Sequence, residues 1–456
     1  MTETERNIAI LHKSQLVEYF EKGNKEPQDW GIGTEHEKFL FQIGDFKRLT
    51  YNSKTGIRTI LEHMRQNDWQ PIMEQEHLIG LRKNGASITL EPGGQFELSG
   101  RNFKTIHDTY IETKKHFEEL KLICQKLNFF SLPMGIDPIT KLEDTPWMPK
   151  ERYKIMRNYM PTKGNLGLQM MTNTATIQVN LDYDSEKDMI VKMRIAQALQ
   201  PIVSAIFANS PFSAGKPNGY LSYRSKIWND TDPDRCGFLP FLFDEGFGFE
   251  RWVDYLLDIP MYFIYRDGKY ISANDITFRD FMTGKHELSP TLEDWETHTS
   301  TVFPDVRLKQ FIEMRGADAS CTSHIASLSA LWVGLLYDGQ SRDEAYKMVS
   351  DWDIETIQSV RSQVPKRGLK AASGNINVGE VAKKLYQIAV DGLIRRSVIS
   401  NSEDEAQYLE PVRRITASGI TQAERLLDRY HNKYNSNLTA LLDNWQTLQL
   451  QSCPNE

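Results

Sequence analysis

One short segment, TEHEKF at residues 34–39, constrains the fold more than any other part of the chain. In a β-strand, Glu35 and Glu37 would point to the same face, because side chains alternate sides with a period of two. Carboxylates that lie close together cannot all stay ionised at neutral pH unless a positive charge offsets their repulsion, and Mg²⁺ prefers such oxygen ligands. The segment therefore predicts a strand whose polar face lines a metal site, with His36 packed behind it.

Three further segments repeat this pattern of paired polar side chains bracketed by apolar residues of opposite parity. They carry Glu91 and Glu97 around the turn of SITLEPGGQFELS, Gln178 and Asn180 in TATIQVNLD, and Glu313 and Arg315 in FIEMRG. Any one pair is also typical of the solvated face of an amphipathic strand. Together, the four pairs indicate one shared site with more than one metal ion, and Arg315 adds the kind of cation that stabilises a phosphoryl group in transfer.

Basic residues supply candidates for binding a substrate carboxylate. Residues 148–163 hold an excess of positive charge in which Arg152 is the main candidate, although a solvated basic helix would explain this segment too. Arg224 and Arg235 lie beside aromatic residues in LSYRSKIWNDTDPDR and are similar candidates that the residues alone do not rank. No convincing phosphate-binding glycine loop and no Ser-His-Asp or Cys-His signature occurs, so catalysis through a protein nucleophile is not indicated.

Composition limits the classes of partner. The chain of 456 residues has a net charge of −7 and 40% hydrophobic residues, which does not favour binding to nucleic acid or to an acidic membrane. No uninterrupted apolar run approaches the roughly 18 residues that span a bilayer, and the first residues lack the apolar region of a signal peptide. The four cysteines are far apart, which predicts reduced thiols and a cytoplasmic protein with small-molecule partners.

The order of predicted elements indicates an α+β fold. We expect helices near 8–22 and 103–127, a strand at 172–182, a helix from the N-cap Ser185 to Asn209, and a hairpin turn at Asp267-Gly268. The chain after Arg315 is predicted to be helical, with capping-box spacings that begin at Ser341, Ser402 and Thr421. We expect a catalytic region at residues 1–340 and a helical C-terminal region at 341–456 that packs on it.

Several long motifs resemble the plant and proteobacterial type of the glutamate–cysteine ligase family, in order, from about residue 12 to about residue 435. They are TEHEKF, EPGGQFELSG, MPKERYKIMRNYMP, TATIQVNLD, SPFSAGKPNGYLSYRSKIW, GFGFERWVDY, DIPMYFIYR and EMRGADAS. That family is similar in fold to glutamine synthetase. The resemblance implies a curved antiparallel sheet, flanked by helices, that forms a funnel with metal ligands on its inner face.

The resemblance also implies roles for the candidate residues. Two or three Mg²⁺ ions would be held by Glu35, Glu37, Glu91, Glu97, Gln178 and Glu313, and Arg315 would meet the transferred phosphoryl group. Arg152 and Arg224 match the family positions that hold glutamate. The implied partners are ATP, L-glutamate and L-cysteine, in a monomer or homodimer. The cysteine pairs that form regulatory disulfides in plant members are not matched, because their positions hold residues such as Tyr110 and Ala326.

The implied reaction is phosphorylation of the glutamate γ-carboxylate by ATP, followed by attack of the cysteine amine to give γ-glutamylcysteine. Three alternatives remain at this point. They are a γ-glutamyl ligase that uses another amine, a phosphagen-type kinase of the same superfamily, and a non-catalytic sensor of glutamate or nucleotide.

Overall fold

A nine-stranded antiparallel sheet forms the centre of the computed structural model, which describes residues 8–400 and 403–448. The strand order is β14-β15-β7-β1-β5-β4-β3-β2, and β6 pairs with the end of β1. The prediction of an antiparallel sheet is thereby confirmed. The strands are β1 (Ile32–Gln42), β2 (Gln70–Glu74), β3 (His77–Lys83), β4 (Ala86–Leu90), β5 (Phe96–Ser99), β6 (Phe129–Leu132), β7 (Thr176–Leu181), β14 (Val306–Leu308) and β15 (Ile312–Asp318).

The register of this sheet brings the predicted polar residues together. Glu37 pairs with Glu97 of β5, and Glu35 pairs with Gln178 of β7. On the other side of β7, Glu313 pairs with Asn180. Because directly paired residues share a face, these side chains all project from the inner face of the sheet. As predicted, His36 is buried behind β1, where it contacts His116 and Phe117.

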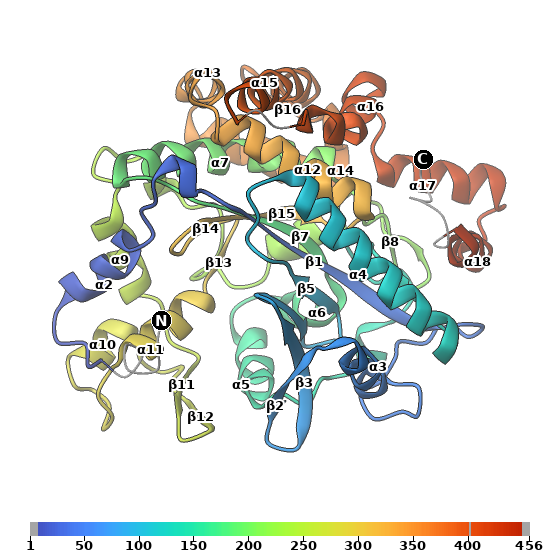
Figure 1. The fold of residues 1–456 in the computed structure, drawn as a ribbon, viewed down its shortest axis with the longest axis horizontal. Coiled ribbons are helices and arrows are strands. Elements are labelled where there is room, and N and C mark those ends of the chain that lie inside the picture. The colour runs from blue at the N-terminus through green and yellow to red at the C-terminus, as the bar shows by residue number, and fades with distance from the viewer. Residues whose placement is uncertain (1–7, 401–402, 449–456) are drawn as a thin grey trace.

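Three long helices cover the outer face of the sheet, as Figure 1 shows: α4 (Ile106–Leu127), α7 (Glu186–Ile206) and α12 (Thr322–Leu336). Two of them begin as capping chemistry dictates, since the Thr105 and Ser185 hydroxyls accept bonds from backbone N–H groups three residues later. Helix α7 is the one described helix long and apolar enough to cross a membrane. Most of that helix is buried inside the protein, so its apolar surface forms part of the core.

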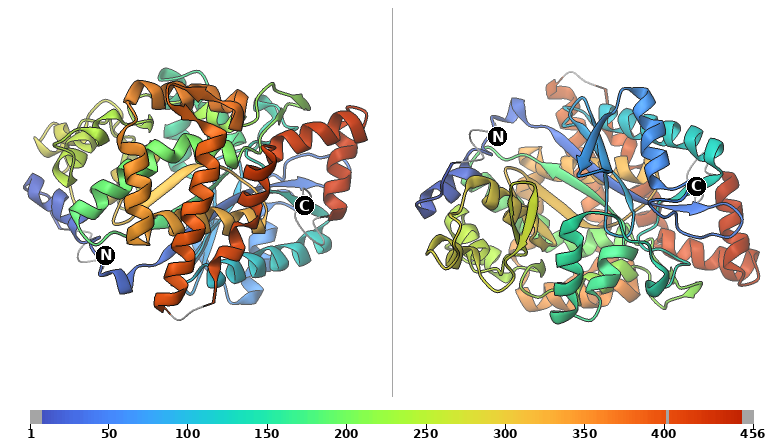
Figure 2. Two further views of the ribbon diagram at one scale, coloured as in Figure 1. Left: turned by 90° about the horizontal axis from the view of Figure 1, so that it is seen from above. Right: turned by 90° about the horizontal axis from the view of Figure 1, so that it is seen from below.

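Shorter elements lie against the inner face. They are α5 (Glu151–Tyr159), α6 (Gly167–Asn173), α8 (Tyr223–Trp228) and the hairpin of β11 (Phe263–Arg266) and β12 (Lys269–Ser272), which Figure 2 shows from below. Asp267 and Gly268 both have positive φ angles, so the predicted hairpin turn is confirmed. The remaining elements before residue 310 are α2 (Lys13–Glu21), α3 (Ile57–Met64), β8 (Phe212–Ser213), β9 (Lys216–Pro217), β10 (Cys236–Gly237), α9 (Phe249–Leu257), α10 (Phe278–Met282), α11 (Leu292–Ser300) and β13 (Phe303–Pro304).

The C-terminal region is helical, as predicted, and packs on α7 and α12 at the top of Figure 1. Thr421 forms the expected capping box with Glu424, whereas Ser402 lies outside the described residues. The predicted helix start at Ser341 is wrong, because Asp338 is the N-cap and accepts a bond from the Ser341 N–H. The elements are α13 (Gly339–Ser350), α14 (Ile354–Arg367), β16 (Ala372–Ser373), β17 (Ile376–Asn377), α15 (Val378–Ser400), α16 (Glu410–Ser418), α17 (Gln422–Asp428) and α18 (Leu438–Leu448). The predicted boundary at residue 340 stays a prediction.

The cysteines correct one expectation. Cys124 and Cys236 are free, but Cys321, the residue directly before α12, is disulfide-bonded. Reduced thiols are therefore not a property of every cysteine in this chain. Wide separation in the sequence does not exclude a disulfide, because only the distance in the folded protein decides whether two thiols can pair.

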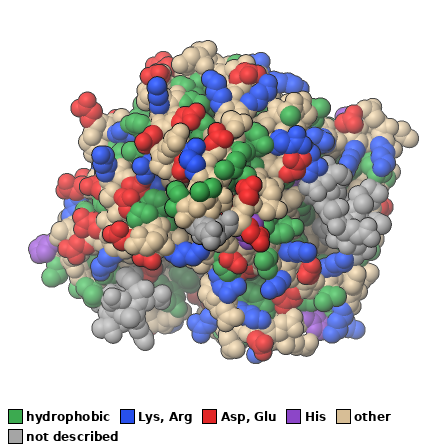
Figure 3. Space-filling view, turned by 45° about the horizontal axis from the view of Figure 1, so that its top comes forward, with side chains coloured by type: hydrophobic (Ala, Val, Ile, Leu, Met, Phe, Trp, Pro, Cys, Tyr) green, Lys and Arg blue, Asp and Glu red, His purple; other side chains and the backbone are tan. Residues whose placement is uncertain are grey.

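The surface carries mixed charge on the face that Figure 3 shows. Lys and Arg side chains alternate there with Asp and Glu side chains over the whole view. The negative net charge is therefore not concentrated into a single-sign patch on this face.

Candidate active site

A cavity of about 240 Å³ opens on the inner face of the sheet, between β1, the β4–β5 turn, β7 and β15 on one side and α5, α6 and α8 on the other. Of the predicted site residues, eight line this cavity: Glu35, Glu37, Glu91, Glu97, Arg152, Gln178, Arg224 and Arg315. Glu313 and Arg235 do not. Six of the eight residues in the four polar pairs therefore line one space, whereas Glu313 and Asn180 do not.

The carboxylates in this cavity are held by polar neighbours but repel one another. Glu35 accepts hydrogen bonds from the Asn180 and Gln178 side-chain amides, at 2.8 and 3.2 Å. Glu37 accepts one from the Thr176 N–H at 3.1 Å. Burial and the nearby Glu91 carboxylate raise the pKa of Glu37 to about 8, and the same two causes raise the pKa of Glu97 well above its ordinary value. A cation in the cavity would offset this repulsion.

The residues present are suited to a hard divalent cation. The described part of the chain contains no preassembled group of three or more His, Cys, Asp or Glu side chains at metal-binding distances. The donor chemistry nevertheless fits Mg²⁺, because four carboxylates and the Gln178 side chain supply only oxygen ligands on the cavity wall. Raised carboxyl pKa values mark positions where a metal ion would displace protons.

Glu313 has a different environment from the other glutamates. It is fully buried, and its carboxylate accepts two bonds from Arg307, at 2.7 and 2.9 Å, and one from Arg315 at 2.6 Å. Burial opposes its ionisation, but Arg307, Lys309 and Arg315 together hold the pKa of Glu313 well below its ordinary value. The predicted face was correct, but the i, i+2 spacing that puts Glu313 on this face also puts Arg315 within its reach. In this structure the carboxylate contacts cations of the protein and does not line the cavity.

Arg315 lies at the centre of the arginine side of the cavity. Its guanidinium group donates to Glu313 and to the side-chain oxygen of Gln178. The sheet register shifts between Met314 and Ala317, so Arg315 sits in a β-bulge where pairing with β7 is interrupted. Bulges re-aim side chains at functional sites, and this one directs Arg315 toward the carboxylates of β1.

Arg152 and Arg224 reach the cavity from the covering helices. Arg152 lies in the first turn of α5, with its guanidinium group 5.2 Å from the centre of the Tyr153 ring. Arg224 is buried in α8 and donates from Nη2 to the Arg315 carbonyl at 2.8 Å. Burial lowers the pKa of Arg224 to about 10, and its Nε has no hydrogen-bond partner among the described residues. A substrate anion beside Arg224 would relieve both costs.

The structure corrects the prediction for Arg235. This side chain is fully buried and donates to Asp232 at 2.7 Å and to the Pro260 carbonyl at 2.8 Å. Its guanidinium group also stacks 3.8 Å from the centre of the Tyr262 ring. Although its Nη1 has no partner among the described residues, Arg235 does not line the cavity, and its other contacts bind it to the protein, so its role in this structure is structural.

Several cavity residues carry no signal in the sequence. The apolar part of the wall consists of Met156, Met170, Met171, Trp228, Phe263 and Phe303. Such residues cannot be told from core residues until the fold is known. Two polar residues of the wall were also not predicted, and only one of them, Thr176, has a signal in the sequence. Thr176 shares the parity of Gln178, whereas Arg307 is the cross-strand neighbour of Glu313, which only the strand register reveals.

Comparisons with known proteins place the chain in a family. The profile of glutamate-cysteine ligase family 2 (GCS2) matches residues 31–441. Glutamate–cysteine ligase A, chloroplastic, of Oryza sativa subsp. japonica is 48% identical over 429 residues, which cover 93% of this chain and 86% of that protein. The chloroplastic glutamate–cysteine ligase of Nicotiana tabacum is also 48% identical, with 93% and 81% covered. That of Arabidopsis thaliana is 44% identical, with 95% and 82% covered.

A solved structure supports the fold. The crystal structure of glutamate–cysteine ligase from Francisella tularensis in complex with AMP has a TM-score of 0.56 and 11% identity, and the match covers 94% of this chain and 89% of that one. The curated relatives contradict the prediction of a cytoplasmic protein, since they are named chloroplastic. The spacing of the cysteines and the composition of the first residues were too weak a basis for that prediction. The family profile matches most of the chain, and the relatives are 44–48% identical to it. The chain therefore belongs to glutamate-cysteine ligase family 2.

Proposed function

We infer that this protein is a glutamate–cysteine ligase, which joins the γ-carboxylate of L-glutamate to the amine of L-cysteine with hydrolysis of ATP. The relatives named above carry this activity in their names, and they match nearly the whole chain. The observation in the structure that best supports the proposal is the division of one cavity into two walls. The glutamate side chains project from the sheet and its β4–β5 turn. Arg152 and Arg224 project from the covering helices α5 and α8, and Arg315 projects from the bulge in β15.

The chemistry requires activation of a carboxylate. An oxygen of the γ-carboxylate attacks the γ-phosphorus of ATP, ADP leaves, and the product is a γ-glutamyl phosphate. The amine nitrogen of cysteine then attacks the acyl carbon and loses a proton, and phosphate leaves as the amide forms. No protein nucleophile takes part in either step. Arg315 stabilises the negative charge on the phosphoryl group in transfer, and Glu313 and Gln178 hold its guanidinium group in place.

Arg152 and Arg224 bind the glutamate substrate. Both guanidinium groups line the cavity, and each can donate two parallel hydrogen bonds to a carboxylate. Arg224 also contacts the backbone of Arg315, which couples the position of the substrate to that of the phosphoryl-binding arginine. Holding the two reactants in line is where much of the rate enhancement of phosphoryl transfer originates.

Glu35, Glu37, Glu91 and Glu97, with Gln178, would hold the two or three Mg²⁺ ions that the resemblance predicts. When bound, Mg²⁺ neutralises charge on the ATP phosphates. The crowding of these carboxylates supports a role in cation binding, because two of them have raised pKa values in the protein alone.

One assay tests this function against the alternatives. Purified protein is incubated with ATP, Mg²⁺, glutamate and a panel of amines that includes cysteine, and the products are analysed by mass spectrometry. We expect γ-glutamylcysteine, ADP and phosphate in equal amounts. An amide with another amine in preference to cysteine, a phosphorylated product without an amide, or binding without turnover would each contradict the proposal.

Two variants connect the assay to the site. Arg315→Met should lose at least a hundredfold in kcat, because removal of a cation from phosphoryl transfer commonly costs about two to five powers of ten. Arg413→Met is the matched control, since Arg413 forms an exposed ion pair with Glu410 on α16. Its kcat should stay within twofold of that of the unmodified protein.

A further inference from the structure

The bulge that carries Arg315 depends on few backbone partners. Between Met314 and Ala317 the pairing of β15 with β7 shifts register, so Arg315 is not held by the ladder with β7 and depends on the neighbouring strand β14. Its N–H donates to the carbonyl of Asp305 at 3.2 Å, next to the last pair of the β14–β15 ladder, and its carbonyl accepts from Arg224 at 2.8 Å and from the Thr176 hydroxyl at 3.2 Å. Among the described contacts, the Asp305 carbonyl is therefore the one hydrogen-bond acceptor for the Arg315 N–H.

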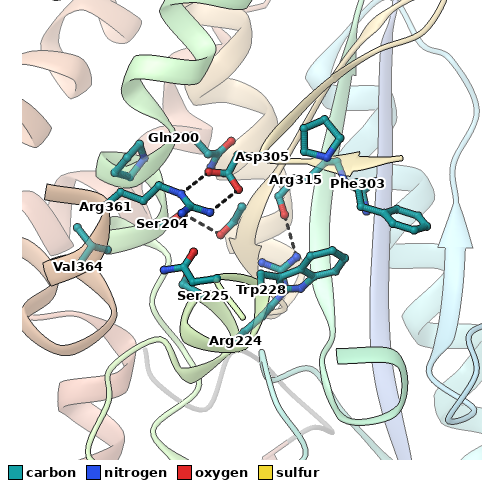
Figure 4. Close-up of a pocket in the computed structure, with 14 residues that line it drawn as sticks. Gln200, Ser204, Arg224, Ser225, Trp228, Phe303, Asp305, Arg315, Arg361 and Val364 are labelled. Carbon is teal, nitrogen blue, oxygen red and sulfur yellow. Dashed lines mark hydrogen bonds and ion pairs between the residues drawn. The ribbon is translucent and has the colours of Figure 1, made fainter. Parts of the chain in front are cut away.

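Asp305 is in turn held by the C-terminal helical region. Its carboxylate accepts two bonds from Arg361 of α14, from Nε at 2.6 Å and from Nη2 at 3.0 Å, as Figure 4 shows. The side chains are only 17% and 20% exposed, so solvent screens this two-point ion pair less than a surface pair. The Asp305 N–H also donates to the carbonyl of Gly237 at 2.9 Å, which fixes the residue from a second direction.

Gly237 leaves room for this arrangement. Its φ angle is +96°, a conformation that favours glycine, and a Cβ atom there would lie 3.3 Å from Arg361 Nη2. The guanidinium group therefore lies directly against the backbone of β10. Helix α14 packs on α7 and α8, so the position of Arg361 is set by the same elements that carry Arg224 and cover the sheet.

Arg361 does not reach a substrate itself. The space between Arg361, Asp305, Arg224 and Arg315 has a volume of about 40 Å³. At roughly 10–15 Å³ for each water molecule, it holds about three waters and no amino acid or nucleotide. Any effect of Arg361 on the reaction must pass through Asp305 and the bulge.

We propose that Arg361 is a positioning residue, which acts through Asp305 to fix the bulged backbone at Arg315 and, through the Arg315 carbonyl, the guanidinium group of Arg224. The helical C-terminal region thereby contributes to the arginine side of the cavity without contacting the substrates. This inference rests on the roles of Arg224 and Arg315 in the proposed function.

The test compares Arg361→Met with a control that removes a similar ion pair elsewhere. Arg342 of α13 forms an ion pair with Asp188 of α7 at 2.7 Å, with side-chain exposures of 26% and 4%. Arg342→Met therefore also removes an ion pair between the C-terminal region and the core. We expect Arg361→Met to lower kcat at least tenfold and to raise the KM for glutamate at least threefold at 25 °C, because small displacements of reacting groups cost about a hundredfold in rate. Arg342→Met should change both values less than twofold.

The KM for glutamate separates positioning from a merely structural role. Loss of folded enzyme lowers the apparent kcat but leaves the KM unchanged. An unchanged glutamate KM in Arg361→Met, or equal effects of the two variants, overturns the proposal. If Arg361→Met does not fold, Arg361→Lys decides, since lysine keeps the charge but cannot make the paired contact. A threefold or larger fall in its kcat supports positioning, and a smaller fall overturns it.

Arg315→Met in the same assay distinguishes the two levels of inference. If that variant is fully active, the proposed role of Arg315 fails. If it is inactive while Arg361→Met behaves like the unmodified protein, only the positioning role fails.

Discussion

Replacement of Glu37 with Gln should make the metal-free protein more stable while removing most of its activity. Glu37 lies opposite Glu97 in the sheet, and burial and Glu91 raise its pKa from 4.5 to about 8. Glutamine has nearly the same shape and can still accept the bond from the Thr176 N–H. The substitution therefore removes the titratable carboxyl group, which must keep its proton in the folded protein, without leaving a backbone donor unpaired.

The magnitude follows from the two pKa values. Below pH 4.5 the carboxyl group is protonated in the folded and unfolded protein, so it costs nothing there. As the pH rises toward 8, only the unfolded chain loses the proton, and the folded state is progressively disfavoured. At about 1.4 kcal/mol for each pKa unit, the cost is about 3 kcal/mol at pH 7 and less than about 1 kcal/mol at pH 5. Glu37→Gln should recover this free energy of unfolding.

Urea denaturation of both proteins in EDTA at pH 5 and pH 7 measures the difference. A matched control is Glu62→Gln, which removes an exposed ion pair with Arg65 and should change stability by less than about 1 kcal/mol at either pH. The reasoning is refuted if Glu37→Gln is less stable than the unmodified protein at pH 7, or if its gain does not shrink at pH 5. Saturating Mg²⁺ should reduce or reverse the gain, because the variant has lost a ligand for the ion.

Three other predictions concern activity and metal binding. Glu35→Gln should lose nearly all turnover while its thermal unfolding stays close to normal, and full activity at moderate Mg²⁺ would contradict the assignment of Glu35 to the metal site. Arg152→Lys and Arg224→Lys should raise the KM for glutamate much more than the KM for ATP, whereas Arg235→Lys should lower stability without changing that ratio, because Arg235 is buried against Asp232. Mg²⁺ should bind more tightly as the pH rises from about 6 to 8 and should release protons, as measured by titration calorimetry in two buffers, since Glu37 holds a proton in the metal-free protein.

The strands of the site could be predicted from the sequence because their signal is strictly periodic. Glu35 and Glu37 share a face in any strand, and the same is true of Gln178 and Asn180, so no knowledge of the fold was needed. The turn between Glu91 and Glu97 was equally clear, because Pro92, Gly93 and Gly94 cannot continue a strand ladder.

Other features depend on partners that are distant in the sequence. The difference between Arg224 and Arg235 lies in what surrounds them, since both are arginines beside aromatic residues. Glu313 was predicted to bind metal because its neighbour Arg307 across β14 and β15 is revealed only by the strand register. The contacts of Asp305 with Arg315 and with Arg361 join residues 10 and 56 positions apart and have no local pattern.

The apolar residues of the cavity wall could not be predicted from the sequence either. Met170, Met171 and Phe303 would suit the core of any protein, and nothing in their spacing marks them as lining a cavity. The predicted start of α13 was wrong because Asp338 and Ser341, three residues apart, are both residue types that favour the N-cap position.

Transfer of oxygen from glutamate to phosphate tests the central claim most directly. Glutamate labelled with ¹⁸O in its γ-carboxylate is incubated with the protein, ATP, Mg²⁺ and cysteine, and mass spectrometry measures the label in the phosphate and the dipeptide. A γ-glutamyl phosphate intermediate requires that each phosphate released carry one ¹⁸O atom from glutamate and that one γ-glutamylcysteine form for each phosphate. Formation of γ-glutamylcysteine with unlabelled phosphate, or release of phosphate with no amide product, would contradict the account.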